Sequence, residues 1–399
     1  MFWMKFIFWA SLFILFYCFI GYTMLLWILV QVKKNFFSQK ITGENEIIDP
    51  EVTLIVAAYN EKDFIEQKIV NSLSLNYPPG KIKHLFITDG SDDGTNDIVA
   101  RYPQLILLHQ PERKGKSAAL NRAMQIVTTP IVVFTDANTL LNKNAIKYMA
   151  KHYADSSVGG VSGEKQIEIN SNKNTSGIGE GFYWKYESLL KKLESVFHSL
   201  VGSAGELFSI RTSLFKTIPE NIILDDFYMA LKINKQGYKV AYETKAIAAE
   251  TPSASLADEK RRKVRIASGA YQLAFKFIGM LNVFKYPLFT FQFISHKILR
   301  WFLAPVCILI TLILGFMLFN AGRLYQYLFY AQIIFYVFAL IGWFLQKKKI
   351  VVPLFYFPFY FLFMNYCNVM GWFSYFSGNY NVLWDKSQRQ IQSSPSIPD

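Results

Sequence analysis

Four long stretches of this chain contain no charged residue, and they constrain its fold more than any other feature. The stretches are 6–31, 301–322, 324–346 and 350–384. A helix needs about 20 apolar residues to cross a hydrocarbon core of roughly 30 Å, so each stretch is long enough to span a membrane. The sequence therefore predicts an N-terminal transmembrane anchor at 1–34 and a C-terminal transmembrane block at 299–378.

The first apolar stretch has the position of a signal peptide, but two features favour a permanent anchor. It is longer than a signal-peptide core, and no small-residue cleavage site precedes Lys33 and Lys34. Basic residues after a span mark its cytoplasmic side, and those in 260–265 and 347–349 agree with Lys33 and Lys34. We expect a multi-pass protein of the cell inner membrane or plasma membrane, with the domain at 50–270 in the cytoplasm.

Between the apolar stretches, short aliphatic runs alternate with amphipathic helical patterns. This alternation indicates βαβ units and a mostly parallel sheet. Ligands of such sheets bind beyond the carboxyl ends of the strands, so the polar residues there (Asn60, Asp89 and Asp136) are the first candidates for a site. The aliphatic runs are 53–60, 84–90, 105–110 and 131–138, and the helical patterns lie near 62–74, 93–102 and 116–127.

The formal net charge of +13 does not indicate a nucleic-acid-binding protein, because no helix-turn-helix, zinc-finger or RNA-binding signature accompanies it. Basic clusters beside membrane spans typically contact anionic membrane lipids, and a basic domain also attracts a ligand that carries a diphosphate. The three cysteines, Cys18, Cys307 and Cys367, all lie in apolar stretches. This position favours packing residues over a disulfide framework or a zinc site.

Three acidic motifs follow apolar runs, and each also has a simpler interpretation. Asp89 opens DGSDDGT, which is a common surface-turn composition. Asp136 and Asn138 in FTDANT offer two oxygen ligands for Mg²⁺ or Mn²⁺, although an Asx-turn has the same pattern. Asp225 and Asp226 precede a helical pattern that ends near Gly237, so they also fit a helix cap with a second acid beside it.

Taken together, the motifs of 51–270 resemble the family 2 glycosyltransferases, whose catalytic domain has a GT-A fold. The resemblance implies an α/β fold with a Rossmann-like, mostly parallel sheet, combined here with transmembrane α-helices. AAYNE (57–61) resembles the strand end that holds the nucleotide base of the donor, and DGSDDGT resembles the motif whose carboxylate, Asp89, contacts the nucleotide. The base-binding residues implied are Ala58, Tyr59, Asn60 and Glu61.

Two further motifs resemble the diphosphate and metal sites of the family. RKGKSAALN (113–121) resembles a lysine-rich donor loop, which places Lys116 near the diphosphate. FTDANT stands where the family has an Asp-x-Asp metal motif, so Asp136 and Asn138 are the implied ligands of Mg²⁺ or Mn²⁺. Asn138 departs from the motif, so the second ligand is neutral or Asp136 binds the metal largely alone.

The acceptor side of the family resemblance comes from the second half of the domain. DDF (225–227) resembles the acidic pair that carries the catalytic base, which implies Asp226 as the base and Asp225 beside it. The Gln-x-x-Arg-Trp motif of processive synthases appears as Arg262 to Ile266, and it keeps Arg265 but not the Gln or Trp. GSAGELFSIR (202–211) resembles the segment beside the acceptor, with Gly202, Ser203, Ala204 and Gly205.

The resemblance implies a metal-dependent, inverting glycosyltransferase of cell-surface polysaccharide biosynthesis. It would transfer a sugar from a nucleotide-diphosphate sugar to a saccharide or lipid-linked acceptor. One alternative is a processive synthase that also translocates its polymer, although the late spans offer Tyr, Asn and Gln but no intramembrane charge. Another is an inactive scaffold, which is disfavoured because Asp89, Asp136 and Asp226 are all present.

The segments that flank the C-terminal block are expected to lie at the membrane surface or outside it. Residues 271–298 mix lysines with aromatics, which is typical of an interfacial amphipathic segment. Residues 379–399 form a polar tail. Four crossings would put this tail outside the cell, whereas WDKSQRQ (384–390) resembles a segment that related synthases keep near the cytoplasmic site. A re-entrant last segment would reconcile the two.

Overall fold

The structure, a computed structural model of the full chain, describes residues 1–36, 49–167, 175–251 and 255–382, with the backbone alone for 175–183. The chain forms two units, which we describe separately. The helical unit comprises 1–32, 170–179 and 260–379, and the sheet unit comprises 33–169, 180–259 and 380–399. The expected segment WDKSQRQ and most of the polar tail lie outside the described residues.

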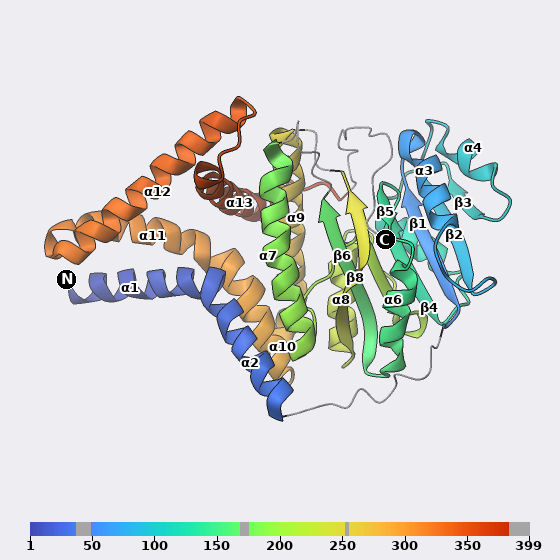
Figure 1. The fold of residues 1–399 in the computed structure, drawn as a ribbon, viewed down its shortest axis with the longest axis horizontal. Helices are drawn as coiled ribbons and strands as arrows, with labels where there is room; N and C mark the ends of the chain where they lie inside the picture. Colours follow the sequence, from blue (N-terminus) through green and yellow to red (C-terminus); the bar gives the residue numbers. More distant parts are fainter. Residues whose placement is uncertain (37–48, 168–174, 252–254, 383–399) are drawn as a thin grey trace. The chain divides into compact units, whose positions relative to one another are not determined.

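An eight-stranded sheet in the order β3-β2-β1-β4-β7-β6-β8-β5 forms the centre of the sheet unit (Figure 1). Parallel pairing joins β1 to β2 and to β4, and β2 to β3, as the βαβ pattern predicts. The other half is mixed, because β7 is antiparallel to β4 and β6, β5 is antiparallel to β8, and β6 is parallel to β8. The strands are β1 Val52–Ala58, β2 Ile82–Asp89, β3 Ile106–Gln110, β4 Ile131–Asp136, β5 Thr139–Leu141, β6 Val158–Ile167, β7 Leu207–Arg211 and β8 Lys239–Glu250.

The helices of the sheet unit follow the expected patterns, with ends that differ by a few residues. Helix α3 buries Ile65 and Ile69, four residues apart on one face, in the core that Leu54, Val56 and Phe86 form. The remaining helices also fill the connections between strands. The bounds are α3 Lys62–Leu73, α4 Thr95–Ala100, α5 Lys116–Met124, α6 Ala145–Lys151, α7 Thr175–Phe197 and α8 Asp225–Lys235, with short 3₁₀ helices at His152–Ala154 and Thr212–Leu214.

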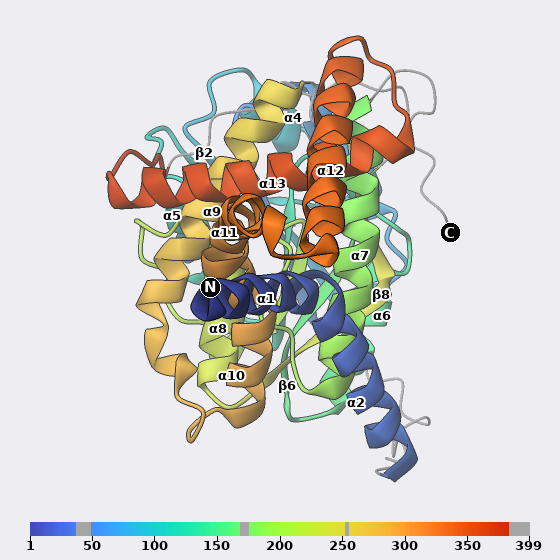
Figure 2. The same ribbon diagram turned by 90° about the vertical axis from the view of Figure 1, so that its left-hand side faces the viewer.

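The helical unit contains apolar helices, which two π-helical segments interrupt, together with the charged helix α9. Figure 2 shows α1 beside α11 and α12 beside α13. The helices are α1 Phe2–Phe16, α2 Tyr22–Phe36, α9 Leu256–Lys276, α10 Pro287–Phe293, α11 Ala304–Met317, α12 Arg323–Lys347 and α13 Pro353–Phe376. The π-helices are Tyr17–Gly21 and Ile294–Leu303, and 3₁₀ helices lie at Ile278–Leu281 and Phe319–Ala321.

Three described helical runs are long and apolar enough to cross a membrane: Phe2–Phe36, Pro287–Met317 and Arg323–Lys347. Helix α13 is 24 residues long but is not among them, so the expected fourth crossing is missing from this set. The second run begins inside the expected interfacial segment and contains Lys297 and Arg300.

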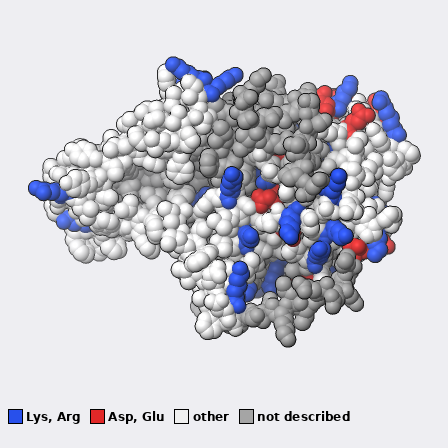
Figure 3. Space-filling view, viewed as in Figure 1, with Lys and Arg blue, Asp and Glu red and all other residues white. Residues whose placement is uncertain are grey.

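The outer surface of these helices is largely apolar. Side chains such as Leu309, Ile313 and Leu340 are about 60% exposed, at 61%, 59% and 63%. On the face drawn in Figure 3, this surface carries charge only near its extremities, whereas Lys and Arg side chains are scattered over the sheet unit. An uncharged apolar surface of this kind is what a lipid bilayer covers, so the helices indicate membrane association.

Candidate active site

The three polar strand ends lie along one edge of the sheet. Strand β1 is in register with β2 at Ala58 and Thr88, and with β4 at Ala57 and Asp136. Because parallel strands point the same way, the residues that follow these positions meet at the carboxyl edge. The sequence placed its first candidates at this edge, and the structure brings them there.

The strand end after β1 and the turn after β2 form one bonded unit. The Asn60 side-chain amide donates to Asp92 Oδ1 at 2.9 Å, and Asn60 Oδ1 accepts the Asp92 backbone N–H at 3.0 Å. The Asn60 backbone N–H donates to Ser91 Oγ at 3.1 Å, and Asn60 adopts a left-handed φ of 52°. The Arg113 guanidinium lies 3.8 Å from the centroid of the Tyr59 ring. The AAYNE motif, the DGSDDGT turn and Arg113 of the lysine-rich loop therefore lie together at the end of β1. Ala58 is the last residue of β1, and Glu61 is the N-cap of α3.

Asp89 is a buried carboxylate that anchors the lysine-rich loop. Its Oδ2 accepts the backbone N–H groups of Lys114 at 2.9 Å and Gly115 at 2.6 Å. Its Oδ1 lies 3.8 Å from Arg122 Nη1, and the residue is 4% exposed. A surface-turn role for Asp89 is therefore wrong, since the side chain points inward and holds the start of α5. Sequence reasoning expected a nucleotide contact and did not foresee this internal use.

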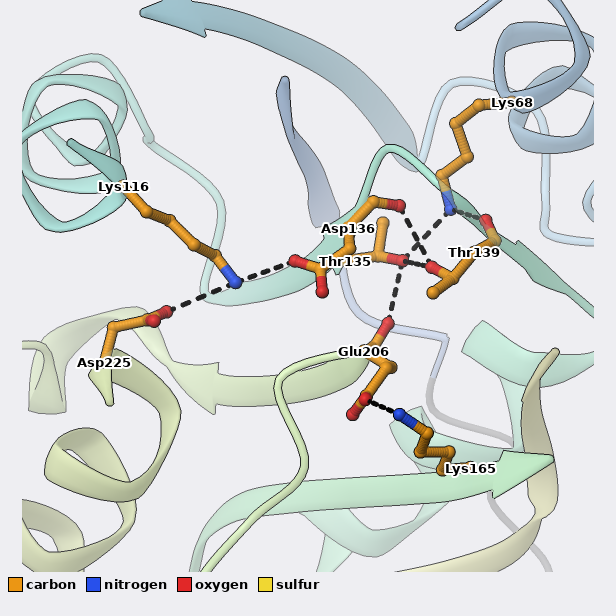
Figure 4. A network of polar contacts seen from close by, with 8 residues as sticks. All are labelled: Lys68, Lys116, Thr135, Asp136, Thr139, Lys165, Glu206 and Asp225. Atoms are coloured by element: carbon orange, nitrogen blue, oxygen red, sulfur yellow. Dashed lines mark hydrogen bonds and ion pairs between the residues drawn. The ribbon is translucent and has the colours of Figure 1, made fainter. Parts of the chain in front are cut away.

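Lys116 joins carboxylates from two distant parts of the sheet unit (Figure 4). Its ammonium donates to Asp136 Oδ1 at 2.7 Å and lies 3.6 Å from Asp225 Oδ2. Burial lowers the pKa of Lys116, but the charges of Asp136 and Asp225 outweigh burial and raise it above the usual range. Lys116 is therefore a permanent cation between the end of β4 and the start of α8.

Asp226 has the chemistry of a group that can accept a proton near neutral pH. Burial is the largest cause that raises its pKa to about 7, and the negative charge of Asp225 adds to the effect. A general base works best when its pKa is close to the working pH. Burial also raises the pKa of Asp136, and the positive charge of Lys116 acts in the opposite direction.

The glycine-containing segment at 202–206 packs against Asp226. A Cβ atom added to Gly205 would lie 3.5 Å from Asp226 Cγ, and the Ser203 hydroxyl donates to the Asp226 backbone carbonyl at 2.8 Å. A Cβ at Gly202 would lie 3.1 Å from the Phe227 ring, which is closer than an ordinary contact. The backbone N–H of Ala204 faces Ser162 Oγ at 3.4 Å. The predicted acceptor segment and DDF are therefore neighbours.

The helix-cap interpretation of Asp225 and Asp226 is wrong in its main point. Leu224 is the N-cap of α8, no side chain caps the helix, and both acids lie in its first turn. Their charges still suit the positive end of the helix dipole. Asp225 faces Lys116 in addition, so both acids belong to the polar cluster.

Of the remaining predicted residues, Asn138 lies in the sheet unit, and Arg262 and Arg265 lie in the helical unit. Asn138 is 8% exposed and follows Asp136 into the short turn before β5. Among the described residues, no group of three or more His, Cys, Asp or Glu side chains could hold a metal ion by itself. Arg262 and Arg265 lie on α9 within the helical unit, so their relation to the cluster stays a prediction.

Sequence reasoning missed four charged side chains near the cluster: the buried Lys68, Lys165 and Glu250, and the partly exposed Glu206. Lys165 on β6 is ion-paired with both Glu206 and Glu250. Lys68 donates a hydrogen bond to Thr135 near the end of β4. Lys68 could have been found, because it lies three residues after Ile65 and one before Ile69, on the apolar face of its helix. Glu206 lies inside a quoted motif but has no distinguishing pattern of its own.

Comparison with known proteins agrees with this architecture. A mannosyltransferase of Pyrobaculum calidifontis, solved with GDP-Man and Mn²⁺, superimposes with a TM-score of 0.69. The match covers 94% of this chain and 99% of that one at 23% sequence identity, so it establishes the fold. Residues 53–218 match the family model described as glycosyl transferase family 2.

Curated relatives extend the similarity beyond the family model. The poly-beta-1,6-N-acetyl-D-glucosamine synthase of Staphylococcus aureus strain MSSA476 is 25% identical over 262 residues, which is 63% of this chain and 62% of that protein. The synthase of the same description from Staphylococcus epidermidis is 23% identical over 337 residues, or 81% of this chain and 79% of that protein. The chain thus aligns with less than two thirds of the first of these relatives.

The mixed sheet, with its polar groups at the carboxyl ends of β1, β2 and β4, defines a GT-A domain. Residues 53–218 form a domain that matches glycosyl transferase family 2.

Proposed function

We propose that this chain is an inverting glycosyltransferase that transfers a sugar from a nucleotide-diphosphate sugar to a saccharide or lipid-linked acceptor in cell-surface polysaccharide biosynthesis. The observation that carries the proposal is the convergence of Lys116, Asp136 and the Asp225–Asp226 pair in a GT-A domain. A cation, a candidate metal ligand and a carboxylate with a pKa of about 7 are the groups that this reaction needs.

The donor would be held along the carboxyl edge of β1 and β2. The Tyr59 ring and the Arg113 guanidinium offer stacking surfaces for a base, and Asn60 is held in place by Asp92. Asp89 holds the 113–116 loop, which brings Lys116 toward the diphosphate. Because Lys116 stays protonated, it can stabilise the negative charge that develops on the leaving diphosphate.

Asp226 would act as the base on the acceptor side. The acceptor oxygen attacks the anomeric carbon, the bond from that carbon to the diphosphate oxygen breaks, and the hydroxyl proton passes to the Asp226 carboxylate. Attack from the face opposite the diphosphate gives inversion. The raised pKa supports this role, because a carboxyl group with an ordinary pKa would be a weak base at neutral pH.

Asp136 and Asn138 are the residues that would hold a Mg²⁺ or Mn²⁺ ion. Their donor set fits a hard cation, and two protein ligands are sufficient when substrate phosphates supply the others. A cation bound there would act as a Lewis acid toward the diphosphate. Lys116 already lies against Asp136, so the same carboxylate can face a positive charge.

The domain would face the cytoplasm, where nucleotide sugars are made, in a multi-pass protein of the inner or plasma membrane. Lys33 and Lys34 at the end of the first apolar run support this orientation. A reporter fused at about residue 150 should behave as cytoplasmic. Extracytoplasmic behaviour of that fusion would contradict both the orientation and the supply of donor.

The similarity to polymer synthases favours a growing saccharide as acceptor and keeps the processive alternative open. Membranes that contain the full chain should be incubated with radiolabelled nucleotide sugars, including GDP-mannose and nucleotide-activated N-acetylglucosamine, with and without Mn²⁺. Transfer from one donor that depends on Asp226 is expected, and product length then separates single transfer from polymerisation. Tight donor binding without transfer from any donor would favour an inactive scaffold.

A further inference from the structure

Helix α3 places a fully buried lysine behind the turn that carries Asp136 (Figure 4). Lys68 is 0% exposed, and its ammonium donates to Thr135 Oγ1 at 3.0 Å and to the Thr139 backbone carbonyl at 2.7 Å. No carboxylate of the described residues forms an ion pair with it. Burial lowers the pKa of Lys68 to about 7, and the charge of Asp136 acts in the opposite direction. The two hydrogen bonds satisfy a polar group that would otherwise be costly to bury.

The two acceptors of Lys68 bracket the candidate metal ligands. Thr135 precedes Asp136, and Thr139 follows Asn138 directly. The Thr139 hydroxyl donates back to the Asp136 backbone carbonyl at 3.0 Å. Lys68 therefore closes the turn from its inner side and limits how far Asp136 and Asn138 can move apart.

The same lysine is linked to the acceptor side through one hydroxyl group. Thr135 Oγ1 accepts from Lys68 and donates to the Glu206 backbone carbonyl at 2.9 Å. Glu206 follows Gly205, the residue that packs against Asp226. The hydrogen bonds from Lys68 to Thr135 and from Thr135 to Glu206 thus connect the Asp136 turn to the segment that faces the candidate base.

We propose that Lys68 is a positioning residue that holds the Asp136–Asn138 turn in the geometry that binds a divalent cation together with the donor diphosphate. It acts through Thr135 and Thr139 and does not touch substrate. The inference rests on the proposed function, since it assigns Lys68 to the metal side of that site. Residues of this kind, which orient metal ligands from behind, typically change metal affinity by about 10- to 100-fold when they are mutated.

The test is Mn²⁺ binding to the purified full chain in lipid nanodiscs, followed by electron paramagnetic resonance in the presence of GDP or UDP. Lys68→Met and Lys68→Gln are a matched pair, since the side chains are similar in length and only Gln can donate a hydrogen bond. Lys68→Met should weaken Mn²⁺ binding by about tenfold or more, and Lys68→Gln by less. Binding of the nucleotide without Mn²⁺ should change by less than about twofold for either variant, because no donor contact is removed.

A milder pair of variants gives the same answer if the Lys68 variants fail to fold. Thr135→Val removes the central hydroxyl without a change in shape. Its control is Thr53→Val, because Thr53 shares a buried 2.8 Å hydrogen bond with Thr129 at the opposite ends of β1 and β4. Both threonines are nearly buried, at 2% and 4% exposure, so the loss of stability should be similar. Thr135→Val alone should weaken Mn²⁺ binding.

Two results separate the inference from the proposed function. Folded Lys68→Met or Thr135→Val protein that binds Mn²⁺ as tightly as wild type, or a Thr53→Val variant that weakens it equally, would overturn the positioning role alone. Sugar transfer by wild type in excess EDTA, with no Mn²⁺ bound in the presence of either nucleotide, would instead overturn the metal site itself.

Discussion

The two halves of the central sheet are held together in different ways. In the parallel half, β1 to β4 are aliphatic strands, and the functional groups project from strand ends that backbone register brings into line. In the mixed half, Lys165 on β6 and Glu250 on β8 carry buried charges into the interior, where Lys165 is ion-paired with Glu250 and with Glu206, the residue before β7. Backbone register aligns the strand ends of the donor half and the buried Asp89 carboxylate anchors the loop beside them, whereas the acceptor half also depends on buried ion pairs and close glycine packing.

Strand β4 borders both halves, and its last residue should give the largest effect. Asp136→Ala should reduce turnover by at least about 10²- to 10³-fold at any Mg²⁺ or Mn²⁺ concentration, since it removes the one carboxylate of FTDANT. Metal titrations of activity would measure this. Asn138→Asp is the companion variant, which should be tolerated or should bind the metal more tightly. Full wild-type activity in EDTA would show that neither residue serves a metal.

The acceptor half is tested next by Asp226→Asn. The amide keeps the size of the side chain but cannot take up a proton, so kcat should fall by about 10²- to 10⁴-fold. Nucleotide affinity, measured by calorimetry, should be nearly unchanged, because the donor half is intact.

Asp225→Asn is the neighbouring control. It loses a charge 3.6 Å from Lys116, so its effect should be moderate and should include donor binding. A dead Asp225→Asn enzyme beside an active Asp226→Asn enzyme would move the base by one residue. If both variants stay active, the DDF motif is only the start of a helix and carries no catalytic base.

Asp89→Asn tests the donor half. It should weaken nucleotide binding, which Asp226→Asn should leave nearly unchanged. The change weakens a charged acceptor of two loop N–H groups, which should cost roughly 1.5–3 kcal/mol of nucleotide binding. Calorimetry with the nucleoside diphosphate measures the loss. Asp92→Asn, in the same turn but exposed, should cost less than about 1 kcal/mol. Equal losses for both variants would show that the turn as a whole matters, and not the buried carboxylate.

The smallest expected effect is a pH dependence confined to the acceptor half. Because the pKa of Asp226 is raised to about 7, its basic form is lost as the pH falls through that value. The value of kcat should therefore fall by about tenfold between the plateau and pH 6. Nucleotide affinity should change little over this interval. Asp225→Asn should move the kcat limb to lower pH, since the Asp225 charge contributes to the raised pKa.

The parallel half could be predicted from the sequence because its signals are local. The apolar run 131–134 is followed closely by Asp136, so both the strand and the candidate residue at its end are visible within 131–138. The mixed half offers no such signal. Strand β6 contains Gly159, Gly160 and Gly163, and a Cβ at Gly163 would lie 2.6 Å from Leu207. The glycines permit close packing in three dimensions, yet in a sequence they predict a loop.

The sequence predicts which residue types lie at the candidate site, but not every contact that each residue makes. Asp89 and Lys116 are brought to one edge as expected, but the two backbone bonds that Asp89 accepts depend on how a loop 25 residues away folds back. Lys68 was missed because a lysine on an amphipathic helix is usually solvated. A contact with β4, 67 residues further along the chain, gives it its function in our proposal.

The π-helix Tyr17–Gly21 has a consequence for how this chain can be altered or aligned with others. A π-helical turn holds one residue more than an α-helical turn, so every side chain of α2 is rotated by roughly 100° relative to an unbroken helix from α1. Deleting a single residue there would leave the hydrophobic length nearly unchanged. It would nevertheless turn Leu26 and Val30, both buried, toward a different direction. The number of residues in this segment therefore matters more for the packing of α2 than their identity.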